Sequence, residues 1–205
     1  MLTIIDYNAG NIASIQNMLK KIGIKCKIPS IYADIEQADK LILPGVGSFD
    51  YGMSNLKQDN LIEIIKKKSL IDKTPILGIC LGAQLMGNMS EEGKLSGLGL
   101  INMDVRKFDT SKFATSLKVP HMGWNEVMVK KNHPVFEDMY PDPRFYFVHS
   151  YHFVPHNIED VLTTTEYGYE FVSAFQHENI IGVQFHPEKS HKFGMKLLGN
   201  FSKLP

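Results

Sequence analysis

The sequence predicts an α/β protein whose first half builds a parallel sheet covered by helices on both faces. Over residues 1–90, short apolar segments alternate with amphipathic ones. The apolar segments are hydrophobic throughout, as is typical of strands that are buried on both faces of a sheet. In the second half the strand-like segments follow one another closely, which indicates antiparallel hairpins added to that sheet or packed beside it. No linker-like segment divides the chain, so we expect a single domain over residues 1–205.

The first half begins with a strand and a capped helix. Strands are predicted over residues 2–6, 24–28, 40–43 and 75–79. Between the first two, Asn11 is the predicted cap of a helix that ends at Gly23 and places Ile15, Met18 and Leu19 on one face. An amphipathic helix is predicted over residues 59–71, and a helix of small residues follows the fourth strand directly.

The second half is rich in strand-like segments and closes with a helix. The strand-like segments cover residues 98–108, 124–129, 145–154, 161–167, 171–176 and 180–185. The final helix is predicted over residues 190–203, with Ser190 as its cap. Its core-facing residues are Phe193, Leu197, Leu198 and Phe201.

Composition excludes several classes of function. The 22 basic residues are balanced by 22 acidic residues, so the chain lacks the basic surface that binds nucleic acid or an anionic membrane. No apolar run approaches the roughly 20 residues that span a bilayer, and the first residues lack the pattern of a signal peptide. Cys26 and Cys80 are too few for a disulfide framework, which favours a reducing compartment. We therefore expect a cytoplasmic protein.

The sharpest chemical signal is Gly78-Ile79-Cys80-Leu81-Gly82, which lies between an apolar strand and a helix. It has the pattern of a nucleophile elbow with cysteine in place of serine. Glycines are needed there because side chains would clash in so tight a turn. The position near a helix N-terminus favours the thiolate. The alternative interpretation is a packed, unreactive thiol, which is how we interpret Cys26 within its predicted strand.

A cysteine nucleophile requires a base, and the base requires an orienting group. His186 and Glu188 follow the last strand two residues apart, so in extended backbone they share a side. Pro187 holds residue 186 extended. A zinc site built from Cys80, His149, His152 and Glu188 is the alternative, but no paired-cysteine or H-E-x-x-H spacing supports it.

A glycine loop, Pro44-Gly45-Val46-Gly47-Ser48-Phe49, follows the third strand. The carboxyl ends of parallel strands share one edge of a sheet, so this loop is expected near Cys80. Its backbone N–H groups are suited to a developing oxyanion. The alternative, a phosphate-binding loop, lacks the lysine and hydroxyl residue of a P-loop.

These motifs together resemble the class I, triad-type glutamine amidotransferases. The resemblance rests on residues 78–84 and 182–188 and covers nearly the whole chain. Within that family, residues 6–11, 44–49, 119–125, 146–151 and 186–190 are similar to the glutaminase subunit of imidazole glycerol phosphate synthase. The resemblance implies a three-layer, flavodoxin- or Rossmann-like fold, with a mostly parallel central sheet and added antiparallel strands. It implies no metal and no cofactor.

The resemblance also implies hydrolysis of L-glutamine to glutamate and ammonia by a Cys80–His186–Glu188 triad. Val46, Gly47 and Leu81 are the implied oxyanion-binding residues. The implied glutamine-binding positions are Gly47, Gln84, His149, Ser150 and Tyr151. The oxyanion loop is expected to be wrongly aimed until a partner binds its own ligand.

A partner must receive the ammonia, and the resemblance implies a (β/α)8-barrel cyclase subunit in a heterodimer. The resemblance implies that this partner combines the ammonia with a phosphoribulosyl-formimino aminoimidazole carboxamide ribotide. The implied products are imidazole glycerol phosphate, for histidine, and aminoimidazole carboxamide ribotide (AICAR). The residues that we expect at that interface are Asn8, Asn11, Met122, Trp124 and Lys189. Trp124 is the only tryptophan, a residue type that often anchors interfaces. The alternatives are a paralogous glutaminase subunit for amidino-sugar synthesis, a non-catalytic binding module, and a stand-alone cysteine hydrolase or peptidase.

Overall fold

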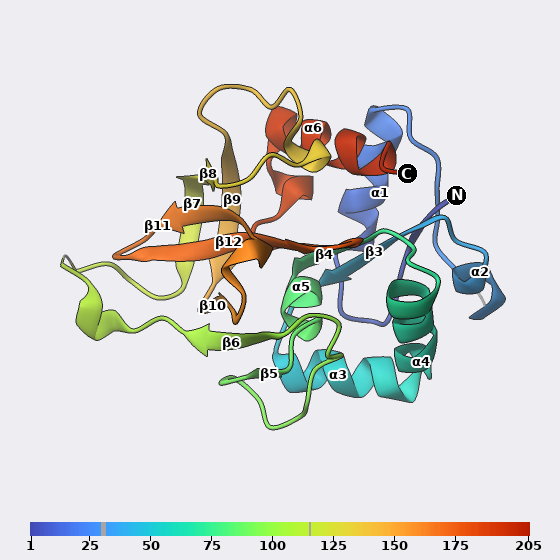
Figure 1. Ribbon diagram of the computed structural model, residues 1–205, viewed down its shortest axis with the longest axis horizontal. Coiled ribbons are helices and arrows are strands. Elements are labelled where there is room, and N and C mark those ends of the chain that lie inside the picture. Colours follow the sequence, from blue (N-terminus) through green and yellow to red (C-terminus); the bar gives the residue numbers. More distant parts are fainter. Residues whose placement is uncertain (30–31, 115) are drawn as a thin grey trace.

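The computed structural model describes residues 1–29, 32–114 and 116–205, and it has the expected three-layer α/β architecture. The central sheet separates two groups of helices (Figure 1). The helices α1 (Ile12–Lys21) and α6 (His191–Ser202) lie over one face. The helices α3 (Phe49–Gln58), α4 (Leu61–Lys66) and α5 (Leu81–Leu85) lie over the other face. None of the helices in the described residues is both long and apolar enough to cross a membrane.

One half of the sheet is parallel. Its strands are β1 (Leu2–Ile4), β2 (Cys26–Lys27), β3 (Lys40–Gly45), β4 (Ile76–Cys80) and β13 (Ile180–Val183). They lie in the order β2-β1-β3-β4-β13. In doubly wound sheets of this kind, ligand sites form at the carboxyl edge of the strands. The register sets Gly45 opposite Cys80 and Ile79 opposite Val183, so β3, β4 and β13 end side by side.

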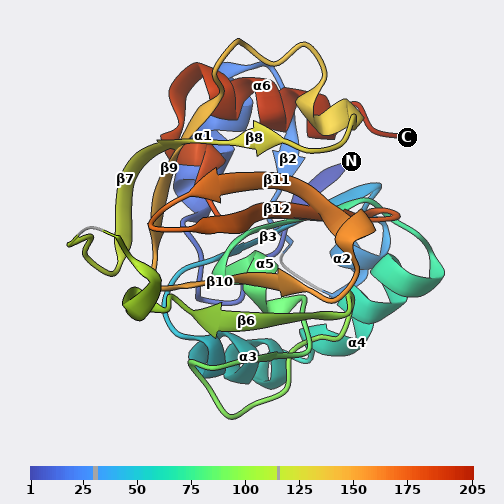
Figure 2. The same ribbon diagram turned by 60° about the vertical axis from the view of Figure 1, so that its left-hand side comes forward.

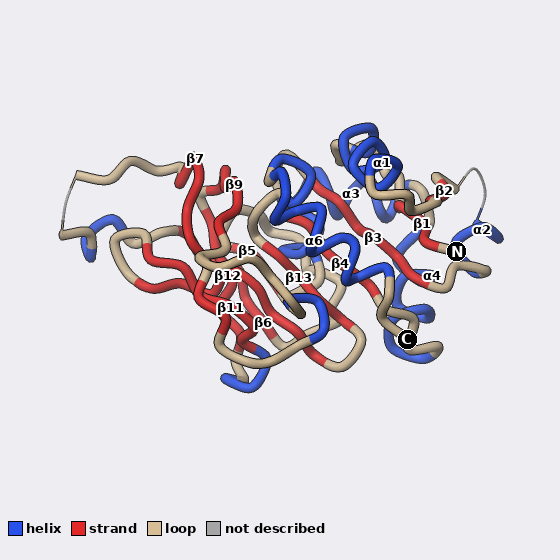
Figure 3. Tube along the Cα trace, turned by 90° about the horizontal axis from the view of Figure 1, so that it is seen from above, coloured by secondary structure: helices blue, strands red, loops and turns tan. Residues whose placement is uncertain are grey.

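The other half of the molecule is mostly antiparallel, as expected, although its strands over residues 89–90 and 103–107 pair in parallel. Strand β12 (Glu170–His177) pairs with β13, and the sheet continues through β10 (Tyr151–Pro155), β6 (Met103–Lys107) and β5 (Met89–Ser90). Strand β11 (Val161–Glu166) joins β12 and β8 (Met128–Val129). Strands β7 (His121–Glu126) and β9 (Arg144–His149) form a separate two-stranded sheet, seen side by side in Figure 2. The chain termini lie at the end of the molecule that is opposite to β7 and β9 (Figure 3).

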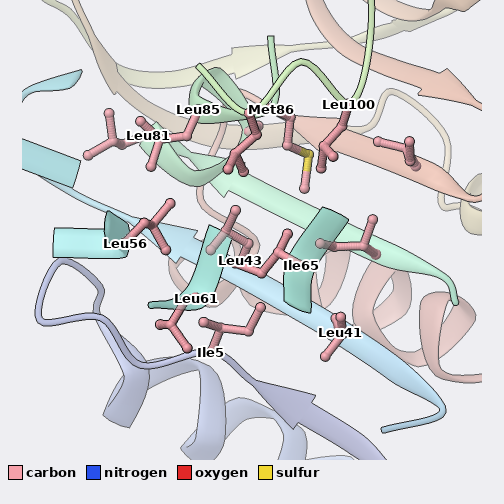
Figure 4. Packing of buried hydrophobic residues seen from close by; sticks show 14 of the residues in the cluster. Ile5, Leu41, Leu43, Leu56, Leu61, Ile65, Leu81, Leu85, Met86 and Leu100 are labelled. Atoms are coloured by element: carbon pink, nitrogen blue, oxygen red, sulfur yellow. The ribbon is translucent and has the colours of Figure 1, made fainter. Parts of the chain in front are cut away.

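Two apolar cores cover the two faces of the parallel strands. Successive residues of a strand point to opposite faces. Leu41 and Leu43 therefore pack with Leu61 and Leu85 beneath α3, α4 and α5 (Figure 4). Ile42 belongs to the other core, which includes the buried residues of α1 and α6. Burying each such side chain stabilises the fold by roughly 1.5–3 kcal/mol relative to exposure.

Three predicted segments of the first half are different in the structure. The prediction missed α3, because Gly52, Ser54 and Asn55 are weak helix formers. Gly52 packs closely on the next helix, since a Cβ on it would come within 2.9 Å of Leu85 Cδ1. The helix predicted over residues 59–71 is α4 followed by a π-helical turn, Lys67–Ile71, and it begins after Asn60, whose φ is 54°. The short helix α2 (Tyr32–Glu36) was also missed.

Several predicted strands have other limits. The strand predicted to break at Pro44 continues to Gly45 because it is paired with β4. The segment 98–108 forms a strand only over Met103–Lys107. The segment 124–129 contributes to two strands, β7 and β8, and the segment 145–154 is divided at Ser150 into β9 and β10. These divisions move the chain from one sheet to the other. Short 3-10 helices cover Thr110–Lys112, Pro134–Phe136, Ile158–Asp160 and Pro187–Lys189.

Candidate active site

Cys80 is the last residue of β4 and has an unusual backbone conformation, with φ 52° and ψ −113°. A non-glycine residue held there stores roughly 1–3 kcal/mol of strain, which is characteristic of functional turns. The flanking glycines permit the close packing of α5. A Cβ on Gly78 would collide with the backbone of Ala83, and one on Gly82 would collide with the carbonyl oxygen of Leu43. The expected strand–turn–helix elbow is present.

His186 and Glu188 form a buried pair beside the end of β13. His186 Nδ1 lies 2.8 Å from Glu188 Oε1, and the two side chains are 2% and 1% exposed. The backbone of His186 is extended, as Pro187 predicts. Glu188 lies in the 3-10 turn Pro187–Lys189, so the expectation that both residues share an extended segment was wrong. The helical turn brings the carboxylate back to the ring.

The charge state of His186 depends on both neighbours. Burial lowers the pKa of His186, but interactions with Cys80 and Glu188 outweigh burial and raise it to about 10. The Nε2 atom is buried and has no hydrogen-bond partner in the described part of the chain. The ring is therefore oriented through Nδ1 and has its second nitrogen available for proton transfer.

Ser190 and Tyr146 hold the backbone that carries His186. The His186 N–H donates to the Tyr146 carbonyl oxygen at 2.8 Å. Ser190 Oγ donates to the His186 carbonyl at 2.6 Å and accepts the Tyr146 N–H at 3.0 Å. Ser190 is at the N-cap position of α6 as predicted, but its side chain makes no cap hydrogen bond. These bonds connect β9 directly to the His186 segment.

The glycine loop lies beside Cys80, as expected, but Val46 points its N–H elsewhere. The Val46 N–H donates to the Ala9 carbonyl at 2.7 Å, so in this conformation it is engaged away from the pocket. Gly47 has φ 103°, a conformation that side chains rarely adopt. The buried Tyr7 hydroxyl donates to the Pro44 carbonyl at 2.7 Å and holds the start of the loop.

A pocket of about 320 Å³ opens above the Cys80 side chain. Its lining residues are Val46, Gly47, Cys80, Leu81, Gln84, Glu92, Pro120, Val148, His149, Ser150, Tyr151, His186 and Lys189. The structure therefore brings together all the predicted oxyanion-binding and substrate-binding residues. Glu188 lies behind His186 rather than in the lining.

Besides Pro120 and Val148 in the lining, three residues of the site were not singled out from the sequence. The first is Gln184, whose Nε2 donates to Cys80 Sγ at 3.7 Å. It was not given a role, although it lies within residues 182–188, which carry the resemblance. Glu92 lines the pocket, and its Oε2 accepts the Phe49 N–H at 2.8 Å. No local pattern marks it. The third residue is Tyr7, whose pKa is raised far above its usual range, mainly by burial and also by the charge of Cys80.

The predicted partner residues are mostly at the surface. Asn8 and Lys189 are exposed, Asn11 is half-buried, and Met122 and Trp124 are 61% and 45% exposed. The Trp124 ring stacks on His191, with centroids 5.6 Å apart and planes within 8°. An exposed, pre-oriented aromatic ring is typical of an interface anchor.

The alternative metal interpretation gains no support from the geometry. In residues 1–29, 32–114 and 116–205, no group of three His, Cys, Asp or Glu side chains is arranged to hold a metal ion. His152 instead lies 2.9 Å from the Tyr169 hydroxyl. Cys26 was expected to be buried, but it is only partly buried because β2 is a two-residue edge strand. Burial raises the pKa of its thiol.

Comparisons with known proteins agree with this geometry. The sequence model of the family described as "Glutamine amidotransferase class-I" matches residues 3–203. The chain belongs to this family. Solved structures with low sequence identity share its fold. One is PurLQS from Thermotoga maritima, with a TM-score of 0.74, 18% identity and coverage of 98% of this chain and 96% of that one. Another is the glutaminase domain of CTPS from Trypanosoma brucei, with a TM-score of 0.66, 15% identity and coverage of 100% and 94%.

Curated members of this amidotransferase family are similar over their full length. The Methanococcus maripaludis protein "Imidazole glycerol phosphate synthase subunit HisH 2" is 53% identical, with 99% of each chain covered. The Pseudomonas aeruginosa protein of the same name is 48% identical, with 100% of each covered. The Sulfurimonas denitrificans subunit HisH is 52% identical, with 99% of this chain and 98% of the relative covered.

Proposed function

We propose that this chain is the glutaminase subunit of imidazole glycerol phosphate synthase, which hydrolyses L-glutamine and supplies ammonia to a cyclase subunit in histidine biosynthesis. The observation that carries the proposal is the strained Cys80, which lines one pocket together with His186, while the buried Glu188 holds His186 from behind. Full-length similarity to proteins named as this subunit supports the choice of pathway.

In the proposed reaction, the Cys80 sulfur attacks the side-chain carboxamide carbon of glutamine. His186 accepts the thiol proton and passes it to the leaving ammonia, which gives a γ-glutamyl thioester. A water molecule that loses its proton to His186 then attacks the thioester carbon and releases glutamate, and the sulfur regains a proton. Glu188 holds the imidazole through Nδ1 at 2.8 Å, so Nε2 faces the reaction.

The pocket suits a small zwitterion. A volume of about 320 Å³ is sufficient for an amino acid with a short side chain, and the lining contains one carboxylate and one ammonium group, Glu92 and Lys189. We assign Glu92 to the substrate ammonium group, since a hydrogen bond from Phe49 N–H already fixes its carboxylate. The backbone of Ser150 and Tyr151, which also lines the pocket, is assigned to the part of the substrate that lies away from its ammonium group.

The engaged Val46 N–H supports a resting state with low activity. An oxyanion hole needs donors that point to the developing charge. The hydrogen bond to Ala9 holds this donor away, so rotation of the Gly45–Val46 peptide completes the hole. We infer that docking of the partner and its ligand favours the rotated form, which prevents glutamine hydrolysis without an acceptor.

The assignment of the nucleophile is tested with Cys80→Ala in a complex with the cognate barrel subunit. We expect glutamate release to fall to the uncatalysed level, because no other group in the pocket has the position of the sulfur. Size-exclusion chromatography with light scattering should show an unchanged complex. Normal glutamine hydrolysis by the variant would refute the assignment.

The amidino-sugar paralogue is the alternative that the sequence left open. The printed names of the relatives, which are subunits of imidazole glycerol phosphate synthase, do not favour it. Complementation of a histidine auxotroph that lacks this subunit separates the two candidates, provided that the cognate barrel is co-expressed. Growth without histidine supports the histidine pathway, whereas failure with a folded, co-purifying complex supports the paralogue.

A further inference from the structure

A hydrogen-bonded path leads from strand β7 to the glutamine pocket through side chains that the mechanism leaves without a role. Asn125 Nδ2 lies 3.2 Å from His121 Nε2. His121 Nδ1 lies 3.0 Å from His149 Nε2, and His149 Nδ1 lies 2.7 Å from the Tyr151 carbonyl oxygen. Both histidines are buried, with exposures of 2% and 6%. The path therefore crosses the interior between β7 and the pocket lining.

The same path continues to the sulfur of Cys80. Gln84 Nε2 donates to the Tyr151 carbonyl at 3.2 Å and to Gln184 Oε1 at 3.1 Å. Gln184 Nε2 donates to Cys80 Sγ at 3.7 Å. The Tyr151 carbonyl oxygen is thus the junction at which the histidine pair meets the two amides behind the candidate nucleophile.

The chemistry of the groups determines the direction of each hydrogen bond. A carbonyl oxygen only accepts, so His149 must carry its proton on Nδ1. In a neutral ring Nε2 then accepts, which requires His121 to donate from Nδ1 and to accept from Asn125. Burial lowers the pKa of His149 well below its usual range and the pKa of His121 to about 4, so both rings are neutral near pH 7. Each member therefore fixes the tautomer of the next.

Strand β7 carries this path on one side and the predicted partner surface on the other. Met122 and Trp124 are exposed, whereas His121 is buried and Asn125 is half-buried. Successive strand residues point to opposite faces. The register of β7 and β9 sets His121 directly opposite His149. A partner that covers Met122 and Trp124 therefore acts on the same short strand that holds His121.

We propose that His121 is a positioning residue that couples docking on β7 to the glutamine pocket through His149 and the Tyr151 carbonyl. This role rests on the proposed function, because it requires a partner at Met122 and Trp124. His121 touches neither the sulfur nor the substrate. It acts by holding the 149–151 segment, and through Gln84 and Gln184 the sulfur, in one arrangement. A hydrogen-bonded path of this kind transmits a shift of β7 without a large movement of the fold.

The surroundings of His121 permit a sharp test. Its ring stacks on Phe147 and Tyr167, with centroids 4.7 Å and 4.0 Å away, so a phenyl ring fits the site. His121→Phe keeps the packing and removes both ring nitrogens. His121→Asn places an amide N–H where Nδ1 lies and restores the donor to His149. His152→Phe is the matched control, since His152 packs on Phe108 like His149 but bonds to Tyr169 and Phe153 instead.

Glutamate release is measured for the isolated chain and for the complex with the cognate barrel partner and its ribotide substrate. In His121→Phe we expect the stimulation by the partner to fall about tenfold, with complex affinity within about twofold of wild type. His121→Asn should recover most of the stimulation, and His152→Phe should keep it. Equal stimulation in His121→Phe and His152→Phe, or no recovery in His121→Asn, would refute the coupling role. A wild-type complex without stimulation would contradict the proposed function, and the coupling role with it.

The path itself is tested without any partner or substitution. In the isolated chain with ¹⁵N-labelled histidine, NMR should show His121 and His149 as neutral Nδ1–H tautomers near pH 7, with protons that exchange slowly. An Nε2–H tautomer at either residue, or a charged ring, would refute the path even where the proposed function holds.

Discussion

At the scale of single residues, one imidazole connects the chemistry of the site to the stability of the fold. The interactions of His186 with Cys80 and Glu188 raise its pKa from 6.5 to about 10, although burial alone would lower it. A base with a raised pKa binds its proton more tightly in the folded state than in the unfolded state. Its contribution to stability is therefore complete below pH 6.5 and is lost as the pH rises toward 10.

This linkage predicts the effect of Glu188→Gln. The variant removes one of the interactions that raise the pKa of His186, so its free energy of unfolding should fall less steeply between pH 6.5 and pH 10 than that of wild type. Urea denaturation at several pH values measures both slopes. Glutamate release should also fall by about 10²-fold or more, because the ring loses its orientation.

The control is Glu159→Gln, the same change of charge at an exposed residue. It should keep the wild-type slope. A wild-type slope in Glu188→Gln as well would show that the buried pair does not raise the pKa of His186.

At the scale of elements, the position of the sulfur depends on backbone-to-backbone contact. Helix α5 packs so closely on β3 that the Gly82 Cα faces the carbonyl of Leu43, and Gly78 meets the backbone of Ala83. Backbone atoms cannot move aside as a flexible side chain can. The two glycines of the elbow are therefore required by packing as well as by the turn.

Two glycine substitutions separate this packing from intrinsic helix preference. Gly82→Ala should destabilise the fold by more than about 4 kcal/mol or prevent folding, because its Cβ collides with backbone. Gly199→Ala, within α6, should stabilise the fold by roughly 0.5–1 kcal/mol, since its Cβ meets only Ile22 Cδ1 at 3.9 Å. Thermal and urea unfolding of both variants measure the difference. Similar effects of the two variants would contradict the packing argument.

At the scale of the whole molecule, the site and the predicted docking surface lie against the same pair of strands. Strand β9 holds His186 through Tyr146, and its neighbour β7 carries Trp124 opposite Tyr146. Lys189 Nζ lies 5.6 Å from the Tyr146 ring centroid, and the Trp124 and Tyr146 rings are 6.5 Å apart. A partner seated on this surface therefore lies close to the backbone of the catalytic histidine that we propose.

Docking at this surface is tested with Trp124→Ala. We expect the affinity for the barrel subunit to fall at least tenfold, because an exposed, stacked tryptophan is typical of a binding hot spot. The melting temperature of the isolated chain should change little. Tyr32→Ala, a similarly exposed aromatic residue on α2 at the other end of the molecule, is the control (Figure 1). Isothermal titration of each variant with the barrel subunit measures the affinities. Equal affinities of Trp124→Ala and Tyr32→Ala would exclude Trp124 from the interface.

The sequence alone determined the fold class and the candidate triad, because these depend on local patterns. Continuous apolar strands and capped helices indicate a buried parallel sheet, and the glycines around Cys80 mark the elbow. Helix α3 was not predicted, because its residues are weak helix formers. Tertiary packing stabilises it instead, with Gly52 against Leu85. Ser150 divides a segment that is strand-like throughout, because the two halves pair with different strands.

Only the tertiary structure decided which distant groups share the site and how they are aimed. Glu92 lines the pocket and Gln184 contacts the sulfur, although both residues lie outside the segment around Cys80 in the sequence. The Val46 N–H is engaged by Ala9, a partner that no local pattern identifies. The His121–His149 pair likewise forms across two strands. The physical reason is that a motif specifies residue types and local backbone, whereas hydrogen-bond partners and pKa values arise from what the folded chain brings within a few ångströms.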